Sequence, residues 1–362
     1  MAVNQSLAQF SDLAFEMALA GYVMALVCLG IEFALGRGSE PTEAESASQA
    51  LRARARGGAG GVDVLERPAI GHVGGQSRGR APWGVRFGRA GLIVLGLGFL
   101  GHVTAIVTRG VAAGRAPWGN MMEITSMICA FAVAGLVGVM VAKAEYRKRF
   151  RALGFFVMVP VVILMYIAQS ALYAAAGTLV PALHSYWLVI HVLAVSLSGG
   201  VLMLSSIASL LYLLRRRYER RLTAEESFRS ANPDSAADAE GNLLAVRGVR
   251  SSRLAVLPSL ATLDRLAYRS AIVAFPVFTF AVIAGAMWAE VAWGRYWGWD
   301  PKETCSFITW VLYAAYLHAR STAGWRGPRA AWISVLAFAS MLFNLFVINL
   351  VVSGLHSYAG LN

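Results

Sequence analysis

The sequence has few charged residues and almost no cysteine. Only 14% of its 362 residues are charged, against about a quarter in a soluble globular protein, whereas 57% are hydrophobic. This composition excludes an ordinary cytosolic enzyme and a disordered protein. It also excludes a nucleic-acid-binding domain despite the net charge of +12, because the basic residues stand in blocks between long apolar runs. The 3 cysteines are too few for a disulfide framework.

Long apolar runs are the dominant feature of the sequence. A helix that spans a bilayer needs about 20 largely apolar residues, and only helices satisfy their own backbone hydrogen bonds in lipid. The sequence therefore predicts an all-α, polytopic integral membrane protein with about eight transmembrane helices. The expected spans are Leu13–Leu35, Ala90–Thr108, Met121–Ala142, Leu153–Ala176, Leu183–Leu214, Ser270–Val291, Thr304–His318 and Trp332–Ser353.

Lys and Arg set the expected orientation of these spans. Of the 32 basic residues, only Arg109, Arg115, Arg295 and Lys302 fall on the side of the membrane that carries the two chain ends. Loops rich in Lys and Arg stay in the cytoplasm. We therefore expect the N-terminus and the C-terminus on the external side, in a bacterial cytoplasmic membrane.

Two long polar connections divide the membrane segments. We expect a first transmembrane helix in residues 1–36, a flexible Arg-rich cytoplasmic loop at 37–89 and further transmembrane helices in 90–214. A second flexible cytoplasmic loop follows at 215–256, and leucines at every third position in 257–268 predict an amphipathic segment on the inner leaflet. The last three helices lie in 269–362, with an external tryptophan-rich loop at 288–303. We find no internal repeat.

The external loop at 288–303 has four of the ten tryptophans of the chain. An aromatic belt at the lipid interface is one explanation, but a belt needs only one or two rings at each helix end. The alternative is a platform of flat rings for a large planar apolar ligand, with Gly294 and Gly298 letting the backbone turn close to that ligand. Asp300 and Pro301 then predict the start of the next helix, as N-cap and first helical residue.

Two histidines are expected at the depth of this loop. His191 lies one to two turns into the fifth span, and His356 follows the eighth span. His318 ends the seventh span, about 21 Å from Thr304 towards the cytoplasmic side. A single membrane histidine is often only a packing residue, but imidazole is also a common axial ligand of haem iron, and a porphyrin is planar and apolar. Zinc is a weaker explanation because no Cys or carboxylate cluster accompanies these histidines. A Ser-His-Asp hydrolase is weaker still because the sequence has no nucleophile motif.

Several segments together resemble the CcsA/ResC family of system II cytochrome c biogenesis, within the tryptophan-rich "WWD" superfamily of haem-handling proteins. Residues 293–303, WGRYWGWDPKE, resemble the WWD signature. Further resemblance lies in 179–191, 263–269, 309–318, 354–358 and the Pro-x-x-Asn-x-x-Glu stretch at 117–123, so that it covers most of residues 90–360. Cys305 stands where the family often has Trp, and His184 stands where it often has Gln.

The resemblance implies a haem b site and a role for each matched residue. His191 and His356 match the two external axial ligands, and His318 matches the membrane histidine that holds haem before export. The haem-binding set also includes Trp293, Arg295, Tyr296, Trp297, Trp299, Asp300 and Lys302. Within it, Arg295 and Lys302 are candidates for contact with the haem propionates, with interfacial solvation as their alternative role.

The implied function is the haem-channel half of a cytochrome c synthase, rather than an enzyme on its own. The implied partners are a ResB/CcsB-type membrane protein, an apocytochrome c with a Cys-x-x-Cys-His segment, and proteins that keep its thiols reduced. We expect no nucleic-acid partner. One alternative is a haem exporter or chaperone of the CcmC type without ligase activity. Another is an unrelated transporter, which would show two similar halves with broken helices, and neither feature is found in the sequence.

Overall fold

The computed structural model describes residues 3–35, 83–142, 147–177, 183–231, 253–352 and 354, and in these residues it contains helices and no strand. The expected all-α fold is therefore confirmed. The elements are α1 (Gln5–Leu35), α3 (Trp83–Ala113), α4 (Met121–Ala142), α5 (Arg147–Ser170), α6 (Tyr186–Ala231), η4 (Arg253–Val256), α8 (Leu260–Trp293), α9 (Pro301–Ser321), α10 (Pro328–Phe343), the π-helical turn η5 (Asn344–Ile348) and α11 (Asn349–Val351).

Seven helices in the described part of the chain are long and apolar enough to cross a membrane, as expected for a multi-pass membrane protein. The exception among the eight expected spans is α9. Its 21 residues are long enough, at about 31 Å. Polar and aromatic residues such as Thr309, Tyr313 and Tyr316 lower its hydropathy, but these three side chains are buried against neighbouring helices.

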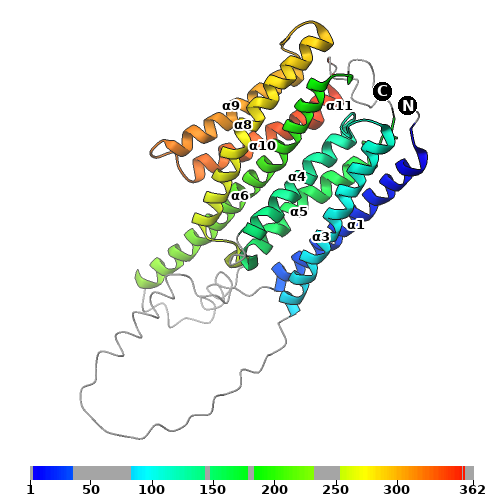
Figure 1. Cartoon of the computed structure of the whole chain (residues 1–362). Coiled ribbons are helices and arrows are strands. Elements are labelled where there is room, and N and C mark those ends of the chain that lie inside the picture. Colours follow the sequence, from blue (N-terminus) through cyan, green and yellow to red (C-terminus); the bar gives the residue numbers. More distant parts are fainter. Residues whose placement is uncertain are drawn as a thin grey trace, which may run out of the picture.

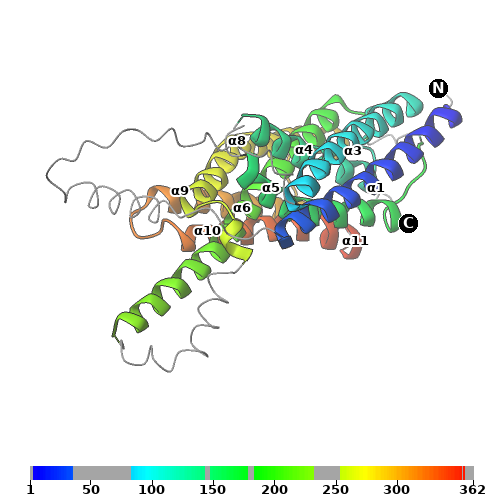
Figure 2. The ribbon, with the colours of Figure 1, turned by 90° about the horizontal axis from the view of Figure 1, so that it is seen from below.

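The helices form one elongated bundle (Figure 1). Seen from below, α1 and α3 lie on one side, α8, α9 and α10 lie on the other, and α4, α5 and α6 stand between them (Figure 2). Helices α1 and α3 approach closely where small residues face each other: a Cβ at Gly98 would lie 3.0 Å from the ring of Tyr22. Small residues at such contacts are the usual basis of helix packing in lipid.

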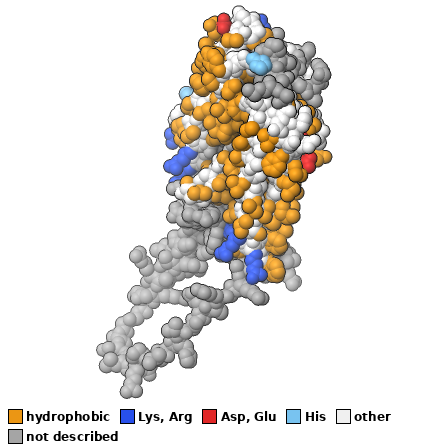
Figure 3. All heavy atoms as spheres, turned by 45° about the vertical axis from the view of Figure 1, so that its right-hand side comes forward, with side chains coloured by type: hydrophobic (Ala, Val, Ile, Leu, Met, Phe, Trp, Pro, Cys, Tyr) orange, Lys and Arg blue, Asp and Glu red, His pale blue; other side chains and the backbone are white. Residues whose placement is uncertain are grey.

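Polar contacts hold the two ends of the bundle. At the end that carries the start of α1, the backbone N–H of Asn4 donates to Ala112 O, and the side-chain amide of Asn349 in α11 donates to the sulfur of Met121. The beginning of α1 and the last helical turn thus lie at the same end, which we call the outer end. At the opposite, inner end, Arg151 pairs with Glu32 at 2.8 Å. Hydrophobic side chains cover the face between the ends, and Lys and Arg gather towards the inner end (Figure 3).

The structure differs from the expected loops in three places. Helix α6 continues to Ala231, so residues 215–231 are helical, and α3 begins at Trp83 inside the expected loop 37–89. Residues 260–268 are the first turns of the continuous helix α8, not a separate segment on the leaflet. Leu257 and Leu263 are buried in the protein core, because the leucine repeat faces α6 and its neighbours rather than lipid. Residues 253–256 of the second loop form η4, and residues 37–82 and 232–252 lie outside the described residues.

Candidate functional site

The tryptophan-rich loop at the outer end is built on two helix caps. Helix α8 ends at Gly294, which adopts the left-handed conformation with φ 70° and donates its N–H to Glu290 O. Helix α9 begins with Asp300 as N-cap and Pro301 as first residue, as expected. Glu303 completes a capping box, and its Oε2 also accepts the N–H of Gly298 at 2.8 Å. The loop is therefore short and fixed at both ends.

The four tryptophans of this loop form two edge-to-face pairs. Trp288 is 3% exposed and packs against Trp293, with ring centres 4.9 Å apart and planes at 61°. Trp297 and Trp299 meet at 90° with centres 5.8 Å apart, and Trp299 is 67% exposed. Within each pair the two ring planes are therefore steeply inclined to each other. The first pair belongs to the protein core, and the second presents aromatic surface outward.

His191 lies in the second turn of α6 and packs against α8. Its Nδ1 donates to Ala281 O at 2.7 Å, because a carbonyl oxygen can only accept. The proton is then on Nδ1, and Nε2 keeps its lone pair without a hydrogen bond to any described residue. The imidazole lies nearly parallel to the Trp288 ring, at 15° and 6.4 Å between centres. This is the arrangement that prepares a histidine to bind a metal through Nε2.

The second expected ligand, His356, lies outside the described residues. Gly354, two residues earlier, is described and lies against the Asp300 cap: a Cβ at Gly354 would stand 2.8 Å from Asp300 Oδ1. Two residues of extended chain reach about 7 Å. The last described residue, Gly354, therefore lies beside the tryptophan-rich loop, two residues before His356 in the sequence.

His318 stands far from this group, near the inner end of α9. Sixteen helical residues separate it from Lys302, which corresponds to about 24 Å. Its side chain is exposed, on the outer face of α9 that also presents Phe307 and Val311. The structure thus separates His318 in depth from His191, as expected, and does not bring the two together.

The charged and polar residues of the loop have different surroundings. Arg295 and Tyr296 are exposed, and the Arg295 guanidinium lies over Gly298, where a Cβ would overlap it. Lys302 instead donates from Nζ to Asn349 Oδ1 at 2.5 Å, linking α9 to α11. Asp300 is a buried helix cap, whose Oδ2 accepts the Lys302 N–H. Arg295 is the cation of this loop that faces solvent.

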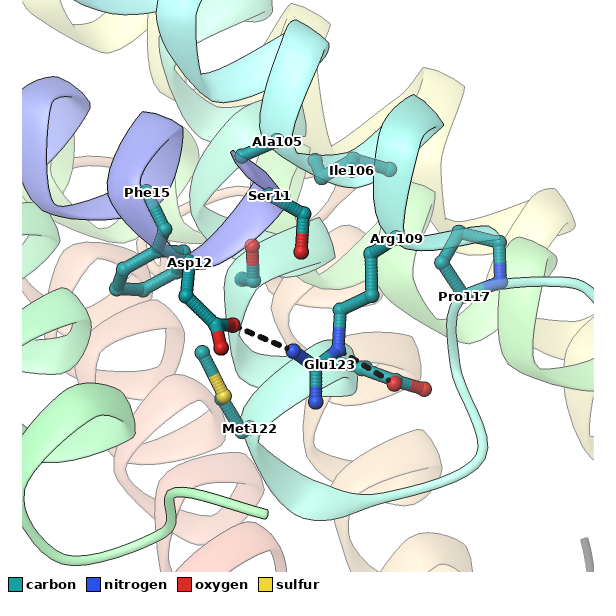
Figure 4. Close-up of a pocket in the computed structure, with 10 residues that line it drawn as sticks. Ser11, Asp12, Phe15, Ala105, Ile106, Arg109, Pro117, Met122 and Glu123 are labelled. Carbon is teal, nitrogen blue, oxygen red and sulfur yellow. Dashed lines mark hydrogen bonds and ion pairs between the residues drawn. The ribbon is translucent and has the colours of Figure 1, made fainter. Parts of the chain in front are cut away.

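A buried ionic cluster at the outer end was not expected from the sequence (Figure 4). Arg109 bridges Asp12 of α1 and Glu123 of α4 at 2.9 and 2.8 Å, and Arg115 adds a second cation 2.8 Å from Glu123. The Tyr173 hydroxyl donates to Asp12, and this hydrogen bond raises the pKa of Tyr173. The sequence signals were available, since Glu123 ends the Pro-x-x-Asn-x-x-Glu stretch and both arginines belong to the four basic residues predicted on the external side.

His102 lies beneath this cluster with both ring nitrogens engaged. Nδ1 is 3.1 Å from the hydroxyl of Tyr22, and Nε2 is 2.8 Å from that of Ser126. Its side chain is fully buried. These contacts give His102 a structural role that ties α1, α3 and α4 together.

Comparisons with known proteins agree with this arrangement. Residues 118–356 match the family model described as cytochrome C assembly protein. The chain is 36% identical over 289 residues to the cytochrome c biogenesis protein CcsA of Gloeobacter violaceus, which covers 72% of this chain and 83% of that protein. It is 32% identical over 306 residues to CcsA of a Picosynechococcus species, covering 75% and 88% of the two chains. It is 38% identical over 229 residues to CcsA of Heterosigma akashiwo, covering 60% and 70%.

The matched residues include the tryptophan-rich loop and the segments of His191, His318 and His356. Within these residues, the outer end combines an imidazole nitrogen that has no hydrogen bond to a described residue with the exposed rings of Tyr296 and Trp299. The chain belongs to the cytochrome c assembly family, as a CcsA-type cytochrome c biogenesis protein.

Proposed function

We propose that this protein carries haem b across the membrane and holds it at the outer end for covalent attachment to apocytochrome c. In this proposal haem is the cargo and one of the two substrates. The carrying observation is His191, whose Nδ1 is committed to Ala281 O while Nε2 is left to bind iron. The second imidazole of the proposed bis-His pair is that of His356, which follows Gly354 by two residues.

The residues of the tryptophan-rich loop fit this cargo. Trp299 and Tyr296 offer exposed aromatic surface to an apolar ring system, and Trp297 adds a partly exposed ring beside Trp299. Trp293 packs on Trp288 at the core side of the loop, and Asp300 caps the helix that follows Trp299. A haem propionate is anionic, and Arg295 is the exposed cation that suits it, since Lys302 is held by Asn349.

His318 is proposed as an earlier holding site for haem. It lies about 24 Å from the level of Lys302, at the end of the molecule where Arg320 pairs with Asp264 at 2.5 Å. Its exposed position on α9 leaves room for another protein beside it. A ResB/CcsB-type membrane protein is the partner that we propose for this face.

A partner is also needed to collect the apocytochrome. The connections that the structure describes at the outer end are short, at 114–120 and 294–300, and form no separate domain. The apocytochrome presents its Cys-x-x-Cys-His segment with both thiols reduced, which requires thiol-reducing proteins. Each thiol adds its sulfur to one carbon of a haem vinyl group and its hydrogen to the other, so the step needs no oxidant.

This chain contributes binding and orientation to that chemistry. Two imidazoles would shield the iron from other ligands while the vinyl groups remain accessible. The histidine of the apocytochrome then replaces one of them. We assign no catalytic residue in this chain, and the synthase activity belongs to the complex with its partner.

The axial-ligand assignment is tested by replacing His191 and His356 with Gly, singly and together. The parent protein, purified with its partner, should show a bis-His haem spectrum. Each single variant should lose this spectrum and should no longer form holocytochrome c. Added imidazole should partly restore both, because it fills the vacant axial position. His72→Gly, in the Arg-rich loop, serves as the control and should behave as the parent protein. Full activity of the double variant without imidazole would remove the proposal.

The same preparation separates the synthase from the CcmC-type alternative. A haem exporter would load the bis-His site normally but form no thioether bonds with added apocytochrome in the presence of its partner.

A further inference from the structure

His191 occupies a notch in α8 that the sequence of α8 leaves open. Ala281, Gly285 and Trp288 follow each other at helical spacing and therefore lie on one face of α8. Ala281 O receives the Nδ1 proton at 2.7 Å, and the Trp288 ring lies nearly parallel to the imidazole. Between them, the imidazole covers Gly285.

The contact at Gly285 is too close for any larger residue. A Cβ there would lie 2.8 Å from both Cε1 and Nδ1 of His191, a distance that real Cβ atoms do not show. The imidazole has only two rotatable bonds, and any swing away from α8 lengthens the hydrogen bond to Ala281 O. Glycine is less favourable than alanine inside a helix, so the stability of α8 does not explain why a glycine stands at position 285.

We propose that Gly285, together with the Ala281 carbonyl, positions His191 as an axial ligand. This inference rests on the proposed function. The carbonyl selects the tautomer with Nε2 unprotonated, and the missing side chain at 285 lets the imidazole lie flat against α8. Together they fix the direction in which the Nε2 lone pair points. Gly285 is thus a positioning residue that acts through His191.

The test is Gly285→Ala in the full chain, co-expressed and purified with its partner. We expect the bis-His absorption spectrum to be lost and the haem-to-protein ratio to fall about tenfold, as for His191→Gly. Gly138→Ala is the matched control, since Gly138 also lies inside a membrane helix, α4, and nothing stands within 4 Å of its added Cβ. That variant should keep the parent spectrum.

A double variant distinguishes positioning from damage to the fold. In His191→Gly, free imidazole should restore the low-spin spectrum, and adding Gly285→Ala should leave that restoration unchanged, because an untethered ring can shift away from the new methyl group. Weaker restoration in the double variant would assign Gly285 to the fold and overturn the inference. A parent spectrum in Gly285→Ala alone would also overturn it. A parent spectrum in His191→Gly would instead remove the proposed function, and the inference with it.

Discussion

Trp299 combines a constrained backbone with an exposed ring. Its φ of 56° places a bulky residue in the left-handed region, where such residues are rare. The Glu303 carboxylate holds the conformation by accepting the N–H groups of Gly298 and Asp300, on either side of it. Strain of this kind persists where the surroundings enforce it, and it collects at ligand sites. Here the residue in this conformation carries a ring that is 67% exposed.

Loss of either outer ring should weaken haem retention. Base stacking on an aromatic side chain is worth about 1–3 kcal/mol by alanine substitution, and we apply that scale to a porphyrin face. Trp297→Ala or Trp299→Ala should therefore lower the haem-to-protein ratio after purification about tenfold. Trp332→Ala is the control, because Trp332 is an exposed residue near the inner end of α10. Equal ratios in all three variants would return the loop to an interfacial aromatic belt.

The connection between α8 and α9 shows which parts of an element can be predicted from sequence. Asp300 and Pro301 were expected at the start of α9, because the signal for a cap is local and depends on the residue type itself. Gly294 was expected only to let the backbone turn near the ligand, and it is also the C-cap of α8. The ring angles of the tryptophans were not predicted, since they depend on how α6 and α8 pack. The notch at Gly285 was also missed: its partner, His191, is 94 residues away in the sequence, and a glycine inside an apolar run gives no sign of what approaches it.

The capping carboxylate should matter to both stability and binding. Glu303→Ala removes the acceptor for two backbone N–H groups of the loop, and loss of a helix cap costs about 1 kcal/mol. We expect a lower thermal midpoint in detergent together with reduced haem retention. Glu303→Gln keeps an acceptor oxygen at the same position and should lose less in both measurements. Identical behaviour of the two variants would show that the charge, rather than the hydrogen bonds, holds the loop.

In the whole molecule, an apolar bundle lies between two polar ends. The spans of the bundle were predicted from the sequence, whereas the contacts at its ends were not. Apolar runs give the spans because lipid forces the backbone into helices. The continuation of α6 through 215–231 was missed, since a polar, Arg-rich stretch was taken as a loop although Arg, Glu and Leu favour helix. The pairing of Arg109 with Asp12, 97 residues apart, depends on the docking of α1 against α3 and has no local signal.

Removal of Glu123 should destabilise the whole bundle. Glu123 is 3% exposed and pairs with Arg109 and Arg115. Breaking a buried ion pair leaves charge without compensation and costs about 3–5 kcal/mol. Glu123→Ala should therefore yield little folded protein, measured as the thermal midpoint by size-exclusion chromatography in detergent. Glu219→Ala removes the more exposed partner of an i,i+4 pair with Arg215, which keeps its hydrogen bonds to the carbonyl groups of Leu254 and Ala255, and should change stability by about 1 kcal/mol or less.

His318 should affect the outer site from the opposite end of the bundle. We expect His318→Ala to lower haem occupancy at the outer site, because in the proposed function haem reaches that site by way of the inner one. Protein level and topology should stay unchanged, since the side chain is exposed. Occupancy is measured from the bis-His spectrum of the purified complex. Normal occupancy and normal maturation would make His318 a surface residue of α9 only.

The ionic cluster also makes two parts of the chain interdependent. The match to the cytochrome c assembly family begins at residue 118, so Glu123 belongs to the family segment. Both arginines that neutralise it, Arg109 and Arg115, come before that segment. A chain cut back to the matched residues would contain a buried carboxylate without its cations. The part of the chain before residue 118 is therefore not a removable addition: Arg109 of α3 and Arg115 of the connection to α4 supply the counter-charge for the buried Glu123.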